Sequence, residues 1–111
     1  MEIVQRLLNA KKAENIEILE VTSRTLMADY FVICSGTSNT HIKALADTLA
    51  LDGKQEGLTK EHIEGYANAK WVLVDYGDII VHIFAPEERE YYDLESLWRE
   101  TAVRLESAVK Q

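Results

Sequence analysis

Features typical of secreted and membrane proteins are scarce in this sequence of 111 residues. Its single cysteine, Cys34, excludes an intrachain disulfide and fits a reducing compartment. No apolar stretch reaches the roughly 18 residues that cross a membrane, and residues 2–12 show helical spacing rather than the pattern of a signal segment. Only one proline is present and 47% of the residues are hydrophobic, which argues against a disordered chain. We therefore expect one cytoplasmic domain over residues 1–111, without membrane contact.

Positive charge is also in short supply. Twelve Lys and Arg residues face nineteen Asp and Glu residues, a net charge of −7, and among the basic residues only Lys11 and Lys12 are adjacent. Nonspecific binding to nucleic acid depends on clustered basic side chains that displace counterions from phosphates. We therefore expect little or no direct contact with nucleic acid. A protein of this charge that works near nucleic acid should bind a basic protein instead.

The apolar pattern predicts seven elements in the order α-β-β-α-β-β-α. Strands are predicted at 15–21, 28–35, 71–76 and 79–84, and helices at 2–12, around 42–49, and from Pro86 along an apolar stripe formed by Leu94, Leu97, Trp98, Ala102, Leu105 and Val109. The link between the first two strands is too short for a helical crossover, so they should be antiparallel neighbours. Gly77 and Asp78 should close a tight hairpin. The fold class is α/β (α+β), with one mixed or antiparallel sheet and packed helices.

One segment could bind a phosphate. Gly36, Thr37 and Ser38 lie between a predicted strand and a predicted helix, where free backbone N–H groups and the helix dipole attract anions. Phosphoryl chemistry also needs carboxylates that hold Mg²⁺ nearby, and the first acidic residue downstream is Asp47, well inside the helix. The pattern therefore favours Ser38 or Thr37 as an ordinary helix N-cap.

The remaining candidates for catalysis or metal binding are isolated residues. Asp75 and Asp78 flank the predicted hairpin turn, where aspartate commonly bonds to the local backbone, although Asp75 could instead meet a cation on a partner. The three histidines lie about twenty residues apart, without the short spacing of a zinc site. His82 interrupts an apolar strand and is expected to be a hydrogen-bonded core or sheet-face residue. Cys34 is expected to be buried and inert. We expect no catalytic, cofactor or metal site.

Aromatic residues provide a better candidate for a binding site. Odd-numbered residues of the strand at 71–76 share one face and even-numbered residues share the other, and both faces are apolar or aromatic. One face should cover the core, while the other needs more helix or a partner. Trp71 and Tyr76, at opposite ends of the strand, are the candidate anchors, because such side chains bury a large area and keep a polar group.

An acidic segment follows these strands. Residues 85–100 contain six acidic and two basic residues, a net charge of −4, together with Tyr91, Tyr92 and Trp98. A solvated helix face would explain such a run of charge. An acidic rim around an aromatic patch would explain it equally, and such a rim would steer a basic partner toward the patch.

Several motifs between residues 64 and 98 occur in a fixed order. A Glu-Gly pair is followed by W-V-L-V-D-Y-G-D, by V-H-I-F and by R-x-Y-Y-D-L-E-x-L-W. This series closely resembles the iojap family of ribosomal silencing factors. The resemblance continues upstream in ADYFVICSGTSNTHIKALAD and covers roughly Leu7 to Trp98.

The resemblance implies a small α/β fold akin to a nucleotidyltransferase domain that lacks the catalytic carboxylates. It implies no enzyme activity, but docking onto large-subunit ribosomal protein fourteen (uL14), so that the bound protein blocks association with the small subunit and represses translation when nutrients are scarce. Two alternatives stay open. The chain could be a nucleotide-binding or nucleotidyltransferase-type enzyme that uses Gly36–Ser38, or the free protein could form a homodimer through its aromatic patch.

The same resemblance suggests which residues contact the partner. Trp71 is the first of them, since it opens the W-V-L-x-D stretch. The other residues at matching motif positions are Asp75, Tyr76, Glu64, His82, Tyr91, Tyr92 and Trp98. Thr40 departs from the family pattern, because many relatives carry an arginine before the histidine.

Overall fold

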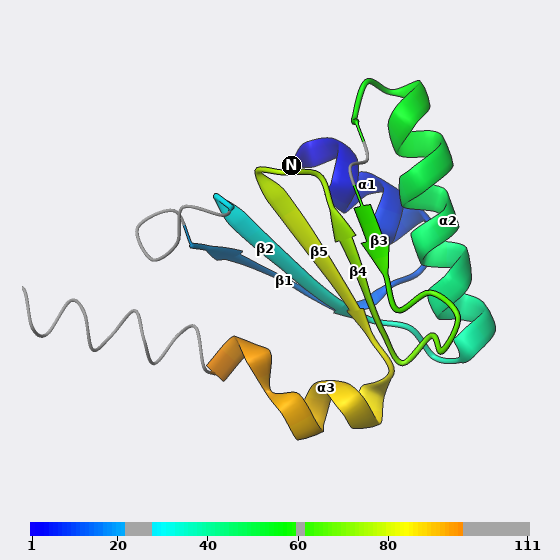
Figure 1. Ribbon diagram of the computed structural model, residues 1–111, viewed down its shortest axis with the longest axis vertical. Coiled ribbons are helices and arrows are strands. Elements are labelled where there is room, and N and C mark those ends of the chain that lie inside the picture. Colours follow the sequence, from blue (N-terminus) through cyan, green and yellow to red (C-terminus); the bar gives the residue numbers. More distant parts are fainter. Residues whose placement is uncertain (22–27, 60–61, 97–111) are drawn as a thin grey trace, which may run out of the picture.

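The computed structural model describes residues 1–21, 28–59 and 62–96, which form a single sheet with helices packed on it (Figure 1). The elements in chain order are α1 (Glu2–Ala10), β1 (Glu14–Glu20), β2 (Tyr30–Ser35), α2 (Asn39–Gln55), β3 (His62–Glu64), β4 (Trp71–Asp75), β5 (Ile79–Phe84) and α3 (Pro86–Tyr92). None of the helices in these three ranges is long and apolar enough to cross a membrane.

The sheet is mixed, as expected. Its five strands lie in the order β1-β2-β5-β4-β3. The central pair, β2 and β5, is parallel, and the other three pairs are antiparallel. The predicted antiparallel pairing of the first two strands is confirmed, and so is the hairpin, in which the N–H of Tyr76 donates to the carbonyl of Ile79 over 2.9 Å.

One face of the sheet carries most of the core. Helices α1 and α2 cover this inner face, and Figure 1 shows them on the side of the sheet away from α3. Apolar side chains three or four positions apart on each helix meet the alternate side chains of the strands. The fully buried residues of α2 and the strands include Ile42, Leu45, Leu49, Val32, Val72, Val74, Val81 and Ile83. Burial of these apolar side chains stabilises the fold.

The outer face of the sheet is only partly covered. Residues directly opposite each other on neighbouring strands point to the same side. The pairings Phe31 with Ile80, Leu73 with His82, and Trp71 with Phe84 therefore place all six side chains on the outer face. Helix α3 follows β5 directly and returns across one end of this face.

Two sequence expectations need correction. Strand β3 was not predicted, because three residues are too few to show an alternating pattern and their conformation comes from pairing with β4. The C-terminal helix is not continuous, because the chain leaves α3 at Asp93, which has a left-handed φ of 45°, and helical conformation resumes at Leu94. The other residues of the predicted stripe, Leu97, Trp98, Ala102, Leu105 and Val109, lie outside the described residues.

Candidate docking surface

Trp71 lies at the centre of an aromatic cluster on the outer face. Its ring packs against Phe84 on β5 and Tyr92 on α3, with ring centroids 4.8 and 4.9 Å apart. Its indole N–H donates to Nδ1 of His82 over 3.1 Å. The side chain keeps part of its surface exposed. Trp71 therefore joins β4, β5 and α3 at one place and fixes the tyrosine beside it.

His82 supports this cluster from below. It is only 5% exposed, and its ring lies 4.9 Å from Phe31 and 6.3 Å from Phe84 between centroids. Burial lowers the pKa of His82 to about 4, so the ring is neutral at pH 7. Because Nδ1 accepts from Trp71, the proton lies on Nε2, a buried atom that has no hydrogen-bond partner among the described residues. The expectation of a buried, hydrogen-bonded histidine is confirmed.

Helix α3 presents its tyrosines to solvent. Tyr91 is 81% exposed and Tyr92 is 52% exposed, and their rings meet edge to face at 5.0 Å. Together with Glu87 and Glu88 they line a shallow pocket of about 340 Å³. Exposed aromatic rings beside carboxylates suit a partner that offers both apolar area and positive charge.

Arg89, which the sequence analysis did not select, anchors α3 to the sheet. Its Nη1 donates to Oγ of Ser35 over 3.0 Å, and its Nε donates to Oε1 of Glu95 over 3.3 Å. Its Nη2 lies 4.0 Å from Oε2 of Glu17. The sequence shows Arg89 as a basic residue within a run of acidic ones, but its partners on β1 and β2 are too far away in the chain to be predicted from that pattern.

The other predicted contact residues occupy different environments. Asp75 and Glu64 lie on the outer face toward the β3 edge, where Glu64 is exposed and pairs with His62 over 2.8 Å. Asp75 accepts from the N–H of Gly77 over 2.7 Å, so Asp75 rather than Asp78 makes the side-chain bond of the turn.

Tyr76 and Trp98 do not join the surface that the structure describes. Tyr76 points to the inner face, is 8% exposed, and donates its hydroxyl to the carbonyl of Leu49 over 2.7 Å. It therefore belongs to the core beneath α2, contrary to its expected place at an interface. Trp98 lies outside the described residues.

The segment Gly36–Ser38 is built as a helix cap. Oγ of Ser38 accepts from the N–H of His41 over 3.1 Å, as predicted for an N-cap. The N–H of Thr37, which a phosphate would need, donates to Nδ1 of His41 over 2.9 Å. A Cβ on Gly36 would lie 2.6 Å from Cγ1 of Ile42, so glycine at this position lets α2 pack closely. This geometry gives the nucleotide alternative no support.

Other catalytic and metal candidates find no support in the described part of the chain. Burial raises the pKa of Cys34 to about 12, so its thiol is a poor nucleophile. Within the described ranges, no three His, Cys, Asp or Glu residues come together as metal ligands would.

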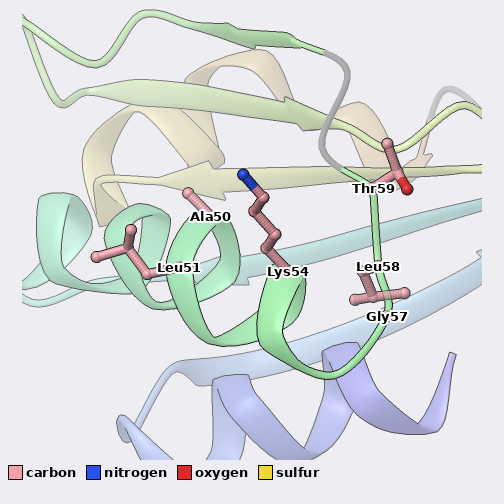
Figure 2. Close-up of a pocket in the computed structure, with 6 residues that line it drawn as sticks. All are labelled: Ala50, Leu51, Lys54, Gly57, Leu58 and Thr59. Carbon is pink, nitrogen blue, oxygen red and sulfur yellow. The ribbon is translucent and has the colours of Figure 1, made fainter.

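A second pocket, of about 550 Å³, lies at the end of α2 (Figure 2). Its described lining consists of Ala50, Leu51, Lys54, Gly57, Leu58 and Thr59. Lys54 is the single ionisable side chain among these six residues. Because α2 covers the inner face, this pocket and the exposed tyrosines of α3 lie on opposite sides of the sheet.

The whole chain is similar to proteins of known family. Residues 1–111 match the family model described as "Ribosomal silencing factor during starvation". A ribosomal silencing factor of Halalkalibacterium halodurans is 40% identical over 97% of this chain and 96% of its own length. The crystal structure of a protein from Chromobacterium violaceum, 34% identical, superposes with a TM-score of 0.85 over 87% of this chain and 81% of that one. A mouse relative named "Mitochondrial assembly of ribosomal large subunit protein 1" is 35% identical over 88% of this chain and 44% of its own length.

Proposed function

This chain belongs to the family of ribosomal silencing factors, and from that membership we propose that it binds the large ribosomal subunit and blocks association with the small subunit. We propose ribosomal protein uL14 as its docking partner. The consequence is repression of translation in the cytoplasm when nutrients are limiting. The protein acts by occupying a surface, and no step of this mechanism requires catalysis or a cofactor.

The observation that carries the proposal is the exposed pair Tyr91 and Tyr92 on an acidic helix, with Tyr92 packed against Trp71. Exposed aromatic side chains are costly to leave in water and are favoured anchors of interfaces. Helix α3 carries three glutamates, Glu87, Glu88 and Glu90, against one arginine. This surface therefore suits a basic ribosomal protein better than the phosphates of ribosomal RNA.

Each residue of the proposed surface has its own role. Tyr91 and Tyr92 make the direct contacts, and Trp71 supports Tyr92 and contributes its exposed edge. His82 holds the indole in place from within the sheet.

Asp75 and Glu64 extend the acidic rim toward β3, and Trp98 remains a proposed contact. We leave Tyr76 out, because its ring lies in the core.

The test is co-sedimentation with purified large subunits, comparing the wild type with Tyr91→Ala. Tyr91 is the better choice for substitution, because replacing Trp71 would also remove its contacts with Phe84, Tyr92 and His82. Loss of an exposed anchor should weaken binding about tenfold or more without unfolding the protein. Tyr66→Ala is the matched control, since Tyr66 lies beside Asp47 and Lys43 on α2.

Two further measurements complete this test. Wild-type protein should reduce the joining of large and small subunits in a sucrose gradient, and Tyr91→Ala should reduce it much less. Mass measured across a dilution series decides whether the free protein forms a homodimer, a state that the acidic α3 helices would oppose if they faced each other. Failure of the wild type to sediment with large subunits contradicts the proposed function.

A further inference from the structure

Helix α3 buries little apolar side-chain area of its own against the sheet. It has only seven residues, and in the described structure none of its side chains is fully buried. Apolar burial therefore acts mainly through the flanking residues Ala85 and Leu94, which are partly buried and pack on the core clusters. Two of its side chains contact different parts of the sheet. Tyr92 packs on Trp71 of β4, and Arg89 contacts Glu17 on β1 and Ser35 on β2.

We propose that Arg89 is a positioning residue for partner binding, because it fixes α3 so that Tyr92 packs on Trp71 and Tyr91 stands beside Tyr92. This inference rests on the proposed function, because it assigns a role within the same surface. Arg89 is 13% exposed in its side chain, so it offers a partner little area of its own. Arg89 therefore affects binding indirectly, by positioning the side chains of α3 that contact the partner.

The geometry requires an arginine. The guanidinium joins three groups in different directions, the hydroxyl of Ser35, the carboxylate of Glu95 and the carboxylate of Glu17. A planar fork of N–H donors can hydrogen-bond to Ser35 and Glu95 while it faces Glu17 at 4.0 Å, whereas the single ammonium of lysine cannot. Hydrogen bonds of this charged kind are stronger than neutral ones, and here they are shielded from solvent.

The charges around Arg89 give a second reason. Residues 85–96 contain five acidic residues and this one basic residue. Glu95 is 12% exposed and Glu17 is 29% exposed, and both carboxylates share the same guanidinium. Removing that cation would leave two carboxylates at one site in a region of reduced dielectric, where they repel each other. The repulsion would push α3 and the residues after it away from β1.

The backbone places the tyrosines between two fixed points. The N–H of Asp93 donates to the carbonyl of Arg89 over 2.9 Å, and the left-handed conformation of Asp93 turns the chain back so that Glu95 reaches the Arg89 side chain. Tyr91 and Tyr92 lie inside this closed turn. Any change that frees Arg89 should therefore move the ring of Tyr92 away from Trp71, and Tyr91 with it.

A double-mutant cycle tests the inference with Arg89→Lys and Tyr91→Ala. If Arg89 acts by positioning the tyrosines, Arg89→Lys should weaken large-subunit binding about tenfold in the wild type but less than about threefold when Tyr91 is already alanine. A purely structural role would lower binding by the same factor in both backgrounds. Arg6→Lys is the matched control, since Arg6 is an exposed arginine on α1 that pairs with Glu56.

The Trp71 indole provides a readout that does not depend on the ribosome. Its ¹H–¹⁵N resonance can be assigned because it disappears in Trp71→Phe. The chemical shift of this resonance depends on the ring of Tyr92, whose centroid lies 4.9 Å from that of Trp71. Arg89→Lys should move this resonance toward its position in Tyr92→Ala, while Arg6→Lys should leave it in place. An unmoved resonance, or equal binding losses in both arms of the cycle, overturns the role of Arg89. Absence of wild-type binding overturns the proposed function instead, and the resonance still tests the position of α3.

Discussion

Trp71 donates its indole N–H to Nδ1 of His82 over 3.1 Å, so an aromatic residue of the proposed docking surface is held by a histidine buried beneath it. The two residues come from neighbouring strands, and the pairing of Leu73 with His82 and of Trp71 with Phe84 makes them diagonal neighbours on one face. The bond needs a neutral histidine with a free Nδ1 lone pair. The stability of the sheet and the orientation of Trp71 are therefore linked.

Trp71 and His82 should show an energetic coupling. Trp71→Phe keeps an aromatic ring but removes the donor, so a buried acceptor loses its partner, which should cost about 1 to 3 kcal/mol of unfolding free energy. In a His82→Phe background the same change should cost roughly 1 kcal/mol less, since no acceptor is left unpaired. Urea unfolding of the four proteins at pH 7 measures the coupling. Strictly additive costs would show that the bond contributes nothing to stability.

Acid should weaken the protein through His82. Burial lowers the pKa of this histidine from 6.5 to about 4 in the folded protein, so the unfolded chain takes up its proton first. The stabilisation is therefore complete above about pH 6.5 and is lost as the pH falls toward 4, with a loss of about 2 kcal/mol by pH 5. Urea unfolding at pH 7, 6 and 5 measures this loss.

His82→Gln separates this effect from the titration of the many carboxylates. The variant should be less stable than the wild type at pH 7, and the difference between the two should shrink by about 2 kcal/mol at pH 5. A constant difference over this range would mean that His82 titrates normally in the folded state.

The sequence could predict the strands with a strong alternating pattern, and it could also assign their faces. Even-numbered residues of β4 lie together on the inner face, as alternation required, and odd-numbered ones lie on the outer face. Alternation could not say which face the helices cover. For that reason the sequence made Tyr76 and Trp71 equally good candidates for partner contact. In the structure Tyr76 lies on the covered face and Trp71 on the open one.

The sequence could not predict relationships that depend on tertiary contacts. Arg89 meets Ser35 and Glu17, which lie more than fifty residues earlier, and no local pattern connects them. Strand β3 is equally hidden, because its extended conformation is stabilised by β4 rather than by its own residues. The aromatic residues of the surface were visible individually, but their packing on Trp71 depends on how α3 returns across the sheet.

Ser38 should behave as a helix cap. Its Oγ accepts from the N–H of His41 at the start of α2, so Ser38→Ala should lower the free energy of unfolding by about 1 kcal/mol. Ser38→Asp should retain most of the stability, because its carboxylate can accept the same bond. Urea unfolding of the three proteins measures both effects. If the alanine and aspartate variants lost equal stability, the cap would not be the role of this residue.

Nucleotides should leave the protein unchanged. The N–H of Thr37 is already bonded to His41, and the adjacent hollow is lined by Glu87 and Glu88 as well as by Lys70. A triphosphate would therefore meet an occupied donor and two negative charges against one positive charge. The melting temperature of the protein should be the same with and without ATP and Mg²⁺. A bound ligand at about a hundred times its dissociation constant stabilises by about 2.7 kcal/mol, so a real site would be easy to detect. A clear shift would restore the nucleotide alternative.

Gly65 and Gly57 should differ sharply in their tolerance of alanine. Both have positive φ, +79° at Gly65 and +98° at Gly57, so a Cβ strains the backbone at either position. This strain should lower the free energy of unfolding by about 1 to 2 kcal/mol. At Gly57 a Cβ would meet nothing within 4 Å, whereas at Gly65 it would lie 2.2 Å from the carbonyl oxygen of Trp71. Gly65→Ala should therefore cost roughly 3 kcal/mol or more, because the backbone must move as well.

The displacement at Gly65 should also reach the proposed docking surface. The carbonyl that must move belongs to Trp71, the first residue of β4, so Gly65→Ala should shift the Trp71 indole resonance and weaken binding to large subunits. Gly57→Ala, at the end of α2, should do neither. Urea unfolding and the indole resonance measure the two effects separately. Equal costs for the two substitutions would mean that the close approach of Gly65 to Trp71 does not constrain the strand.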